Sequence, residues 1–438
     1  MEKLLYNRAM KRKRRPFMIE TKELMPGVRL HSFRDTRFKH GALSIQFVRP
    51  MAKEEAALNA LLPAVLLRGT RDYPDLRAIT LRLDDLYGAS VSALVRRIGD
   101  YQTTGLYTTF IEDKFAMAGD EILKPMLEFL GQMIFCPLIT DGAFPVDYVE
   151  SEKKNLVSTI ESEINDKRVY ASGKLLKNMC QGDSFGLPRL GETEDVERIT
   201  AQALYSHYEK ILRESPVELF YVGSADADVV GNLLKQELQK LCRQVQPLQP
   251  QTAFSGQEGS HETEKMDIAQ AKLCMGFVTP ITNRDPDFPA MQVLNTVFGG
   301  GMTSKLFENV RERMSLCYSI YSGYYGVKGI MTVSAGIDEA KEEQTRAEIL
   351  AQLEACRAGD ISEEELTAAK EALLASLATI HDSPSAIESY YATAALSGIA
   401  FQPDAYAAGV AAVTVADVAA AAQKVRYHSS FFLKGGSQ

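Results

Sequence analysis

The sequence predicts an α+β fold made of two homologous α/β-sandwich domains that face each other around a cavity. The chain has 438 residues, which suits two domains of ordinary size. A segment rich in Pro, Gln, Gly and Ser, from Val245 to Glu264, interrupts the regular pattern near the middle. The predicted elements after this segment repeat the order of those before it, which indicates a duplicated unit.

These observations divide the chain into four parts. Residues 1–18 form a basic N-terminal tail, 19–245 the first domain, 246–265 a linker and 266–438 the second domain. The tail holds five consecutive basic residues, Lys11–Arg15. We interpret them as a solvated tail, with contact to anionic lipid or RNA as the alternative.

In the first half, a β-rich stretch is expected at 28–48, where the domain opens. Apolar residues at helical spacing, including Leu76, Ile79 and Leu83, indicate helices that precede and follow alternating strands. The expected helices are 54–67, 75–87, 115–135, 145–166 and 204–212, and the expected strands are 90–110 and 217–222.

In the second half, the linker is expected to lead into a strand from about Met266. The expected strands then lie at 271–278, 317–325, 330–336 and 431–433, and the expected helices at 288–298, 304–313, 340–358, 362–380, 385–396 and 415–424. A Gly-containing turn after a helix, then a second helix and a strand pair, occurs in both halves.

Charge and composition exclude several classes of function. A net charge of −8 argues against a general nucleic-acid binder, which needs a surplus of Lys and Arg. No segment approaches the roughly twenty apolar residues that span a bilayer. The six cysteines are scattered without a CxxC pair, as is typical of a reducing compartment. The chain is therefore expected in the cytoplasm, with no nucleic-acid partner and no membrane span.

Six passages carry a resemblance that becomes specific when they are taken together. They run over most of both halves in a fixed order, and they resemble the insulinase (pitrilysin) family of inverted-zincin metallopeptidases, in the small bacterial branch related to mitochondrial processing peptidase. The passages are ALLPAVLLRGT (60–70), LYGASVSA (86–93), VESEKKN (149–155), LGETEDVERIT (190–200), VELFYVGSAD (217–226) and FGGGMTSKLFENVRERMSLCYSIYS (298–322).

The sequence departs from this family at the residues that would hold zinc. An active member has a HxxEH helix, in which two histidines ligate zinc and the glutamate activates a water molecule. The histidine positions fall on Ala60 and Ala64 and the glutamate position on Pro63, so neither metal binding nor proton transfer is available there. The third ligand position is matched to Glu150, with Glu152 as the alternative. The resemblance therefore implies no metal in this chain.

The second half retains a pair of residues that the family uses. Arg311 and Tyr318, seven positions apart, match an Arg that contacts the substrate backbone and a Tyr whose hydroxyl helps hold the developing oxyanion. The structural alternative is that Arg311 pairs with Glu308 and Glu312 on a helix surface, and that Tyr318 is a strand core residue.

The glycine run Gly299–Gly300–Gly301 permits two interpretations. It lacks the GxxxxGK[ST] continuation of a phosphate loop. We interpret it as a hinge-like turn that needs positive φ. A substrate-gating role, by loose resemblance to the glycine-rich loop of the processing peptidase's non-catalytic subunit, is the alternative.

The function that follows from the resemblance is that of a non-catalytic subunit in a heterodimeric zinc metallopeptidase. The expected partner is a HxxEH-containing subunit that holds the zinc, and the expected ligand is an extended peptide. Two alternatives stay open: a structural or assembly protein of the same family that has lost catalysis, and a stand-alone peptide-binding homodimer.

Overall fold

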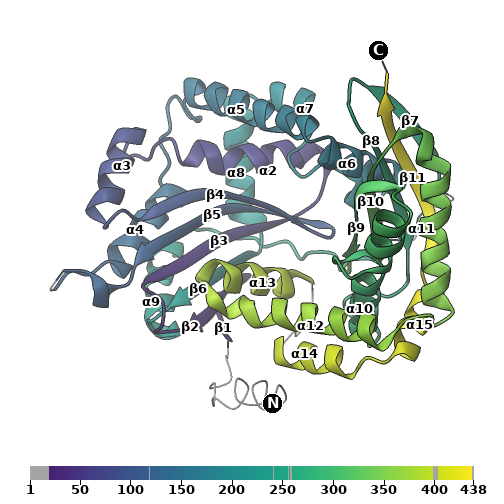
Figure 1. Ribbon diagram of the computed structural model, residues 1–438. Helices are drawn as coiled ribbons and strands as arrows, with labels where there is room; N and C mark the ends of the chain where they lie inside the picture. The colour runs from purple at the N-terminus through teal and green to yellow at the C-terminus, as the bar shows by residue number, and fades with distance from the viewer. Residues whose placement is uncertain are drawn as a thin grey trace.

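The computed structural model describes residues 19–436 except 118, 240, 255, 257–258 and 398–402, so the predicted basic tail lies outside the described residues. Two β-sheets form the frame of the protein, one in each half (Figure 1). The first contains β1 (Ile19–Met25), β2 (Val28–Arg34), β3 (His40–Pro50), β4 (Ser90–Ile98), β5 (Tyr101–Ile111) and β6 (Val217–Gly223). The second contains β7 (His261–Met266), β8 (Ala271–Val278), β9 (Cys317–Tyr325), β10 (Ile330–Ile337) and β11 (Arg426–Gly435).

The two sheets share one topology, which confirms the predicted duplicated unit. Their strand orders are β1-β2-β6-β3-β5-β4 and β7-β11-β8-β10-β9, so the second sheet repeats the first without β1. Each has one parallel pair at the same place, β2 with β6 and β7 with β11, and the remaining neighbours are antiparallel. A parallel pair needs a long crossover, and each half supplies one through its helices.

Helices cover the outer face of each sheet and bury one apolar core per half. The first half contains α2 (Lys53–Leu66), α3 (Leu76–Asp85), α4 (Leu123–Phe135), α5 (Val146–Asn165), α6 (Lys167–Met179), α7 (Thr193–Glu197), α8 (Ala201–Glu214), α9 (Ala227–Leu238) and the short η1 (Asp113–Phe115) and η2 (Ser184–Gly186). The second contains α10 (Phe288–Gly299), η3 (Leu306–Arg313), η4 (Glu339–Lys341), α11 (Glu342–Arg357), α12 (Glu363–Thr379), η5 (Ile380–Asp382), α13 (Pro384–Ser397), α14 (Pro403–Ala412) and α15 (Val415–Gln423).

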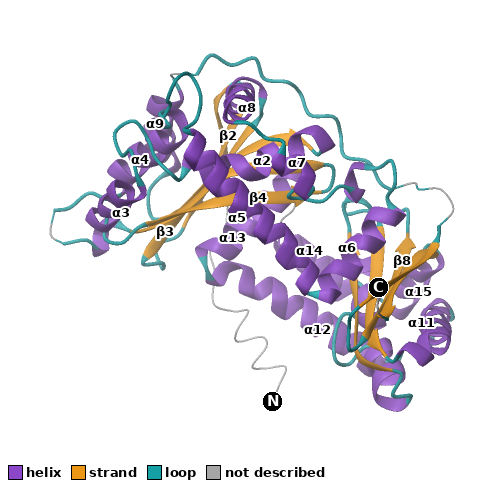
Figure 2. Ribbon diagram, turned by 90° about the horizontal axis from the view of Figure 1, so that it is seen from above, coloured by secondary structure: helices purple, strands orange, loops and turns teal. Residues whose placement is uncertain are grey.

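The halves exchange one helix each across their junction (Figure 2). Helix α6 of the first half packs on β8 and β11, where Leu175 joins Cys274 and Phe431 in an apolar cluster. Helix α13 of the second half packs on β3 and β6, where Ile387 and Tyr391 join a second cluster. Each half is therefore completed by a helix of the other.

The β4–β5 and β9–β10 turns meet at the centre of the molecule. The Lys328 ammonium group is fully buried there and lies 2.7 Å from Asp100 and 3.0 Å from Asp183, both in the first half. A buried lysine requires such partners, because desolvation without them is costly. This ion-pair cluster holds the two halves in one arrangement.

Several element boundaries differ from those expected. The strand expected from about Met266 begins at His261, inside the predicted linker, because it pairs in parallel with β11. The helix expected at 115–135 begins at Leu123. Five further elements, β1, α6, α7, α9 and α14, were not anticipated. Among the described residues, no single helix has the length and apolarity to cross a membrane, although α14 and α15, bent by 98°, pass that test as a pair.

Candidate functional site

Helix α2 takes the place at which the family's zinc helix is expected. It is continuous to Leu66 although Pro63 lies inside it, as predicted. Proline has no N–H to donate to the carbonyl oxygen of Asn59, four residues earlier. The hydroxyl of Thr104 on β5 donates to this carbonyl instead, at 2.7 Å. The sheet thus supplies the hydrogen bond that proline removes from the helix.

The three substituted positions of α2 are packed into the protein. Ala60 is 6% exposed, Pro63 is buried and Ala64 is half-buried. These side chains offer no donor atoms to a metal ion. Across the part of the chain that the structure describes, no three His, Cys, Asp or Glu side chains come together as a metal-binding group. The residues of this chain therefore do not fit the zinc ion that the family would hold here.

The two candidate carboxylates on α5 face different ways. Glu150 has a half-exposed side chain and accepts a hydrogen bond from Lys153 at 2.9 Å. Glu152 lies 3.0 Å from Arg68, just beyond the end of α2. The carboxylate that faces α2 is thus Glu152, and the match of Glu150 to the third ligand position stays a prediction.

A buried polar cluster lies beside α2 and was not anticipated from the sequence. Asn59 donates to Gln102 at 2.8 Å and accepts from His207 at 2.8 Å. Burial lowers the pKa of His207 to about 4. The imidazole is consequently neutral in the folded protein at neutral pH.

Arg311 and Tyr318 lie at the surface of the second half. The Arg311 side chain is 38% exposed, and its guanidinium group lies 4.5 Å from the ring centroid of Phe307. Tyr318 is 61% exposed and donates a hydrogen bond to Asp338 at 3.1 Å. Burial raises the pKa of Cys317 to about 11, against an opposing effect of the Arg311 charge, so the guanidinium group lies near the start of β9.

The structure supports one part of the structural alternative for Arg311 and Tyr318 and contradicts the other part. Arg311 does lie 3.5 Å from Glu312, as in the structural alternative. Tyr318, however, is not a strand core residue. The pairing of β9 with β10 shifts register between Gly336 and Ile337, and this bulge turns Tyr318 to solvent beside the buried Cys317. Its catalytic role stays a prediction.

Helix η3, which carries Arg311, differs from the expected α-helix. It is a π-helix, extended by a bond from the Met314 N–H to the Asn309 carbonyl five residues earlier. π-helical turns are rare and frequent at functional sites. This widened turn sets the direction of the helix end that leads into β9.

The structural reason for glycine in the run 299–301 differs from the one expected. Among Gly299, Gly300 and Gly301, none has positive φ. A Cβ on Gly299 would come within 2.8 Å of both Leu306 and Ser322. Close approach of the backbone therefore requires glycine here, and the expectation of a positive-φ turn was wrong. A gating role stays a prediction.

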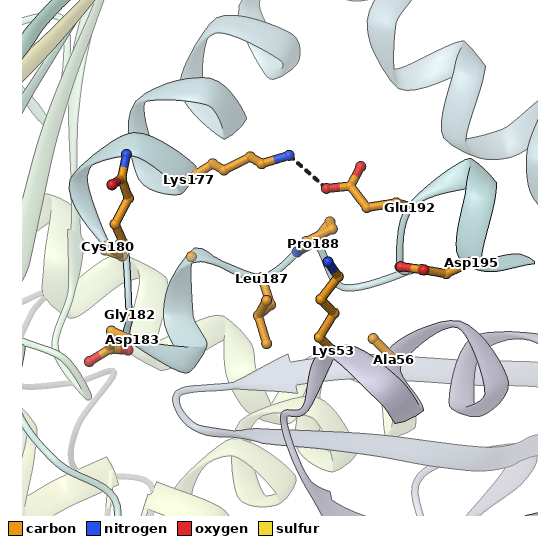
Figure 3. A pocket seen from close by; sticks show the side chains of 13 residues that line it. Lys53, Ala56, Lys177, Cys180, Gly182, Asp183, Leu187, Pro188, Glu192 and Asp195 are labelled. Carbon is orange, nitrogen blue, oxygen red and sulfur yellow. Dashed lines mark hydrogen bonds and ion pairs between the residues drawn. The ribbon is translucent and has the colours of Figure 1, made fainter.

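A cavity of about 270 Å³ lies beside the first turn of α2 (Figure 3). Its lining comes from the first half alone and includes Lys53, Ala56, Cys180 and an ion pair between Lys177 and Glu192 at 2.7 Å. Neither the substituted zinc positions nor Arg311 and Tyr318 line this cavity. It is thus separate from the predicted site residues.

Known proteins match this chain over up to 96% of its length. Residues 198–373 match the family model described as peptidase M16 inactive domain. The probable inactive metalloprotease YmfF of Bacillus subtilis is 30% identical over 419 residues, which cover 96% of this chain and 98% of that protein. A conserved protein from Enterococcus faecalis V583 has a similar crystal structure, with a TM-score of 0.89, 28% identity, and coverage of 96% of this chain and 99% of that one.

A more distant structure shares the fold alone. The crystal structure of a peptidase M16 inactive domain from Pseudomonas fluorescens has a TM-score of 0.79 at 17% identity, covering 96% of this chain and 98% of that one. The two-domain arrangement is thus common to proteins whose sequences have diverged widely.

Proposed function

The chain belongs to the peptidase M16 (insulinase) family as an inactive member, and from this premise we propose that it is the non-catalytic subunit of a heterodimeric zinc metallopeptidase. The observation that carries the proposal is the exposure of Tyr318, at 61%, on a surface that also presents Arg311. The contacts of both side chains, to Phe307, Glu312 and Asp338, lie within the second half. Such a pair is available to a second protein.

The proposed partner is a family member with an intact HxxEH helix, and the zinc belongs to it. This chain cannot replace that helix, because Ala60, Pro63 and Ala64 supply neither ligand nor base. The two subunits then have separate roles. The partner holds the metal, and this chain contributes the side of the site that binds the substrate backbone.

The chemistry of the pair fits this role. The Arg311 guanidinium group presents several donors in one plane and would bind a peptide carbonyl before and during the reaction. The Tyr318 hydroxyl, which now donates to Asp338, would turn to donate to the oxygen that gains charge in the transition state. An extended peptide would be held by main-chain hydrogen bonds to a sheet edge.

The proposed location of this subunit is the cytoplasm. All six cysteines are free, and four of them are buried. Free thiols in a chain of this size are typical of a reducing compartment.

The experiment that tests the proposal is isolation of the tagged chain from its own organism, with sequencing of the copurified protein and metal analysis of the complex. We expect a chain of similar length with HxxEH and one zinc ion per pair. A complex without zinc would contradict the proposal and favour the structural or assembly alternative. A protein that remains a homodimer at cellular concentration would favour the peptide-binding alternative.

A further inference from the structure

The cavity beside the first turn of α2 is enclosed mainly by one folded loop (Figure 3). We call this loop, residues 180–192 between α6 and α7, the cavity loop. Two glycines permit its course. A Cβ on Gly191 would come within 2.7 Å of Ala57, and a Cβ on Gly186 would come within 2.6 Å of the carbonyl oxygen of Cys180. Close backbone packing thus holds the walls in place, so the cavity is formed before a ligand enters.

Part of the cavity lining is apolar. It includes Ala56, Leu187 and Pro188. Cys180 belongs to this part as well, because burial raises the pKa of its thiol to about 12 and keeps it uncharged at neutral pH. An apolar cavity of about 150 Å³ holds a benzene molecule. A cavity of about 270 Å³ therefore has room for a benzene-sized group and several further atoms.

A lysine without a partner lines the same cavity. Lys53 is exposed at the start of α2, and its side chain extends toward the cavity loop near Pro188 (Figure 3). It forms no ion pair with any residue that the structure describes. Its ammonium group is therefore available to an anionic group of a ligand.

Carboxylates line the α7 side of the cavity. Glu192 accepts a hydrogen bond from Lys177 at 2.7 Å, and Asp195 accepts one from the exposed Arg198 at 3.3 Å. Each of these bonds uses one carboxylate oxygen, which leaves the second oxygen for another donor. A cation on one side, carboxylates on another and apolar surface between them complement a molecule that carries a carboxylate, an ammonium group and an apolar side chain.

The cavity loop also takes part in the junction between the two halves. Asp183, which lines the cavity, lies 3.0 Å from the buried ammonium group of Lys328 in the second half. The ring of Phe185 packs edge-on against Tyr325, also in the second half, with centroids 5.3 Å apart. A ligand that holds the cavity loop in place therefore holds these contacts in place as well.

From these observations we infer that the cavity binds a free α-amino acid with an apolar side chain, and that the bound amino acid stabilises the junction between the halves. Lys53 binds its carboxylate, Glu192 and Asp195 bind its ammonium group, and the apolar lining surrounds its side chain. This inference gives the chain a regulatory ligand. It goes beyond the proposed function and does not depend on it, because the cavity is separate from Arg311 and Tyr318.

The test titrates the purified chain with L-phenylalanine in a calorimeter, and we expect one molecule bound per chain. Three related compounds each lack one part of this probe. Glycine lacks the apolar side chain, 3-phenylpropionate lacks the ammonium group, and 2-phenylethylamine lacks the carboxylate. Each loss should weaken binding about tenfold or more, because each removes one of the three recognised groups.

Two variants assign the charged groups. Lys53→Glu reverses the charge at an exposed position, and acidic residues suit the first turn of a helix, so the fold should be retained. It should weaken binding of L-phenylalanine and 3-phenylpropionate about tenfold or more and leave 2-phenylethylamine within about threefold. Asp195→Asn should weaken 2-phenylethylamine about fivefold and leave 3-phenylpropionate unchanged. Lys39→Glu is the control, since Lys39 is exposed in the same half and does not line the cavity.

Hydrogen exchange with and without L-phenylalanine tests the effect on the junction. Backbone amides of the cavity loop and of residues 326–329, between β9 and β10, should exchange more slowly when the amino acid is bound. Circular dichroism of each variant confirms that the fold is intact.

Several outcomes would overturn the inference: no binding of L-phenylalanine, binding unaffected by Lys53→Glu, or equal binding of all four compounds. Slower exchange only outside the cavity loop and α2 would place the amino acid elsewhere and would also overturn it. Slower exchange of the cavity loop without residues 326–329 would refute the stabilisation of the junction. Since the assays contain neither the partner nor zinc, failure here leaves the proposed heterodimer standing.

Discussion

The α2 region of the first half and the η3–β9 region of the second differ in what their side chains face. In α2, Ala60 and Pro63 are buried, and Thr104 completes the hydrogen bonding of the helix. In η3–β9, Arg311 is partly exposed and Tyr318 is exposed, and their partners Glu312 and Asp338 lie in the same half. The positions matched to the family's zinc helix are thus packed, while those matched to its substrate side still present polar groups. Loss of the metal-binding residues did not require loss of this polar surface.

The largest expected effect comes from Tyr318→Phe in a complex with the zinc-bearing partner. Removal of one oxyanion donor typically lowers kcat about a hundredfold, so we expect that loss with assembly intact. Tyr427→Phe is the matched control, because it removes the hydroxyl of another exposed tyrosine of the second half, one that bonds to Arg346 on α11 and to Ser430 on β11. Peptidase assays with a quenched fluorogenic substrate measure both. Full activity of Tyr318→Phe would show that the η3–β9 region, like the α2 region, takes no part in the reaction.

Arg311→Ala should have a smaller effect, mainly on KM. The guanidinium contact exists before the transition state, and a hydrogen bond to a charged group is worth about 1.5 kcal/mol, or roughly tenfold. Arg313→Ala provides the control, since Arg313 is exposed on the same helix and bonds to Asn309. Equal kinetics of the two variants would exclude Arg311 from the site.

The packed character of α2 predicts a stability effect without an effect on substrate binding. Thr104→Val leaves the Asn59 carbonyl buried without a donor and should lower the free energy of unfolding by about 1–3 kcal/mol. Thr103→Val is the control on the same strand, because Thr103 is fully buried and its hydroxyl has no partner among the described residues. Urea denaturation compares the two. A loss in Thr103→Val as large as in Thr104→Val would refute the compensation for Pro63.

The smallest expected effect is a pH dependence of stability from His207. Its folded-state pKa is lowered from 6.5 to about 4, so its contribution is intact above pH 6.5 and is lost as pH falls towards 4. The loss should reach on the order of 1 kcal/mol by about pH 5.5. His207→Gln, which can still bond to Asn59, should flatten this window in unfolding curves taken at several pH values. An unchanged slope of the free energy of unfolding against pH would show that burial does not control the pKa of His207.

The sequence predicted the repeated architecture because apolar periodicity is local and each half carries it. It also placed Pro63 inside a helix. It could not predict the exchange of α6 and α13, since their partners lie in the other half. The exposure of Tyr318 depends on a bulge between Gly336 and Ile337, and strict alternation would have placed it in the core beside Ile320.

The glycine run and the carboxylates of α5 show the same limit. Sequence indicated that Gly299 is special but not whether conformation or close approach is the reason. The resemblance offered both Glu150 and Glu152 for the third ligand position, and only helix packing shows that Arg68 meets Glu152. Contacts between distant elements decide such points.

The most direct test of the account is a titration of the purified zinc-bearing partner with this chain, followed by peptidase activity. We predict that the partner alone is nearly inactive, that activity rises until one equivalent of this chain is present, and that Tyr318→Phe binds equally well but restores little activity. A partner that is fully active without this chain would contradict the account.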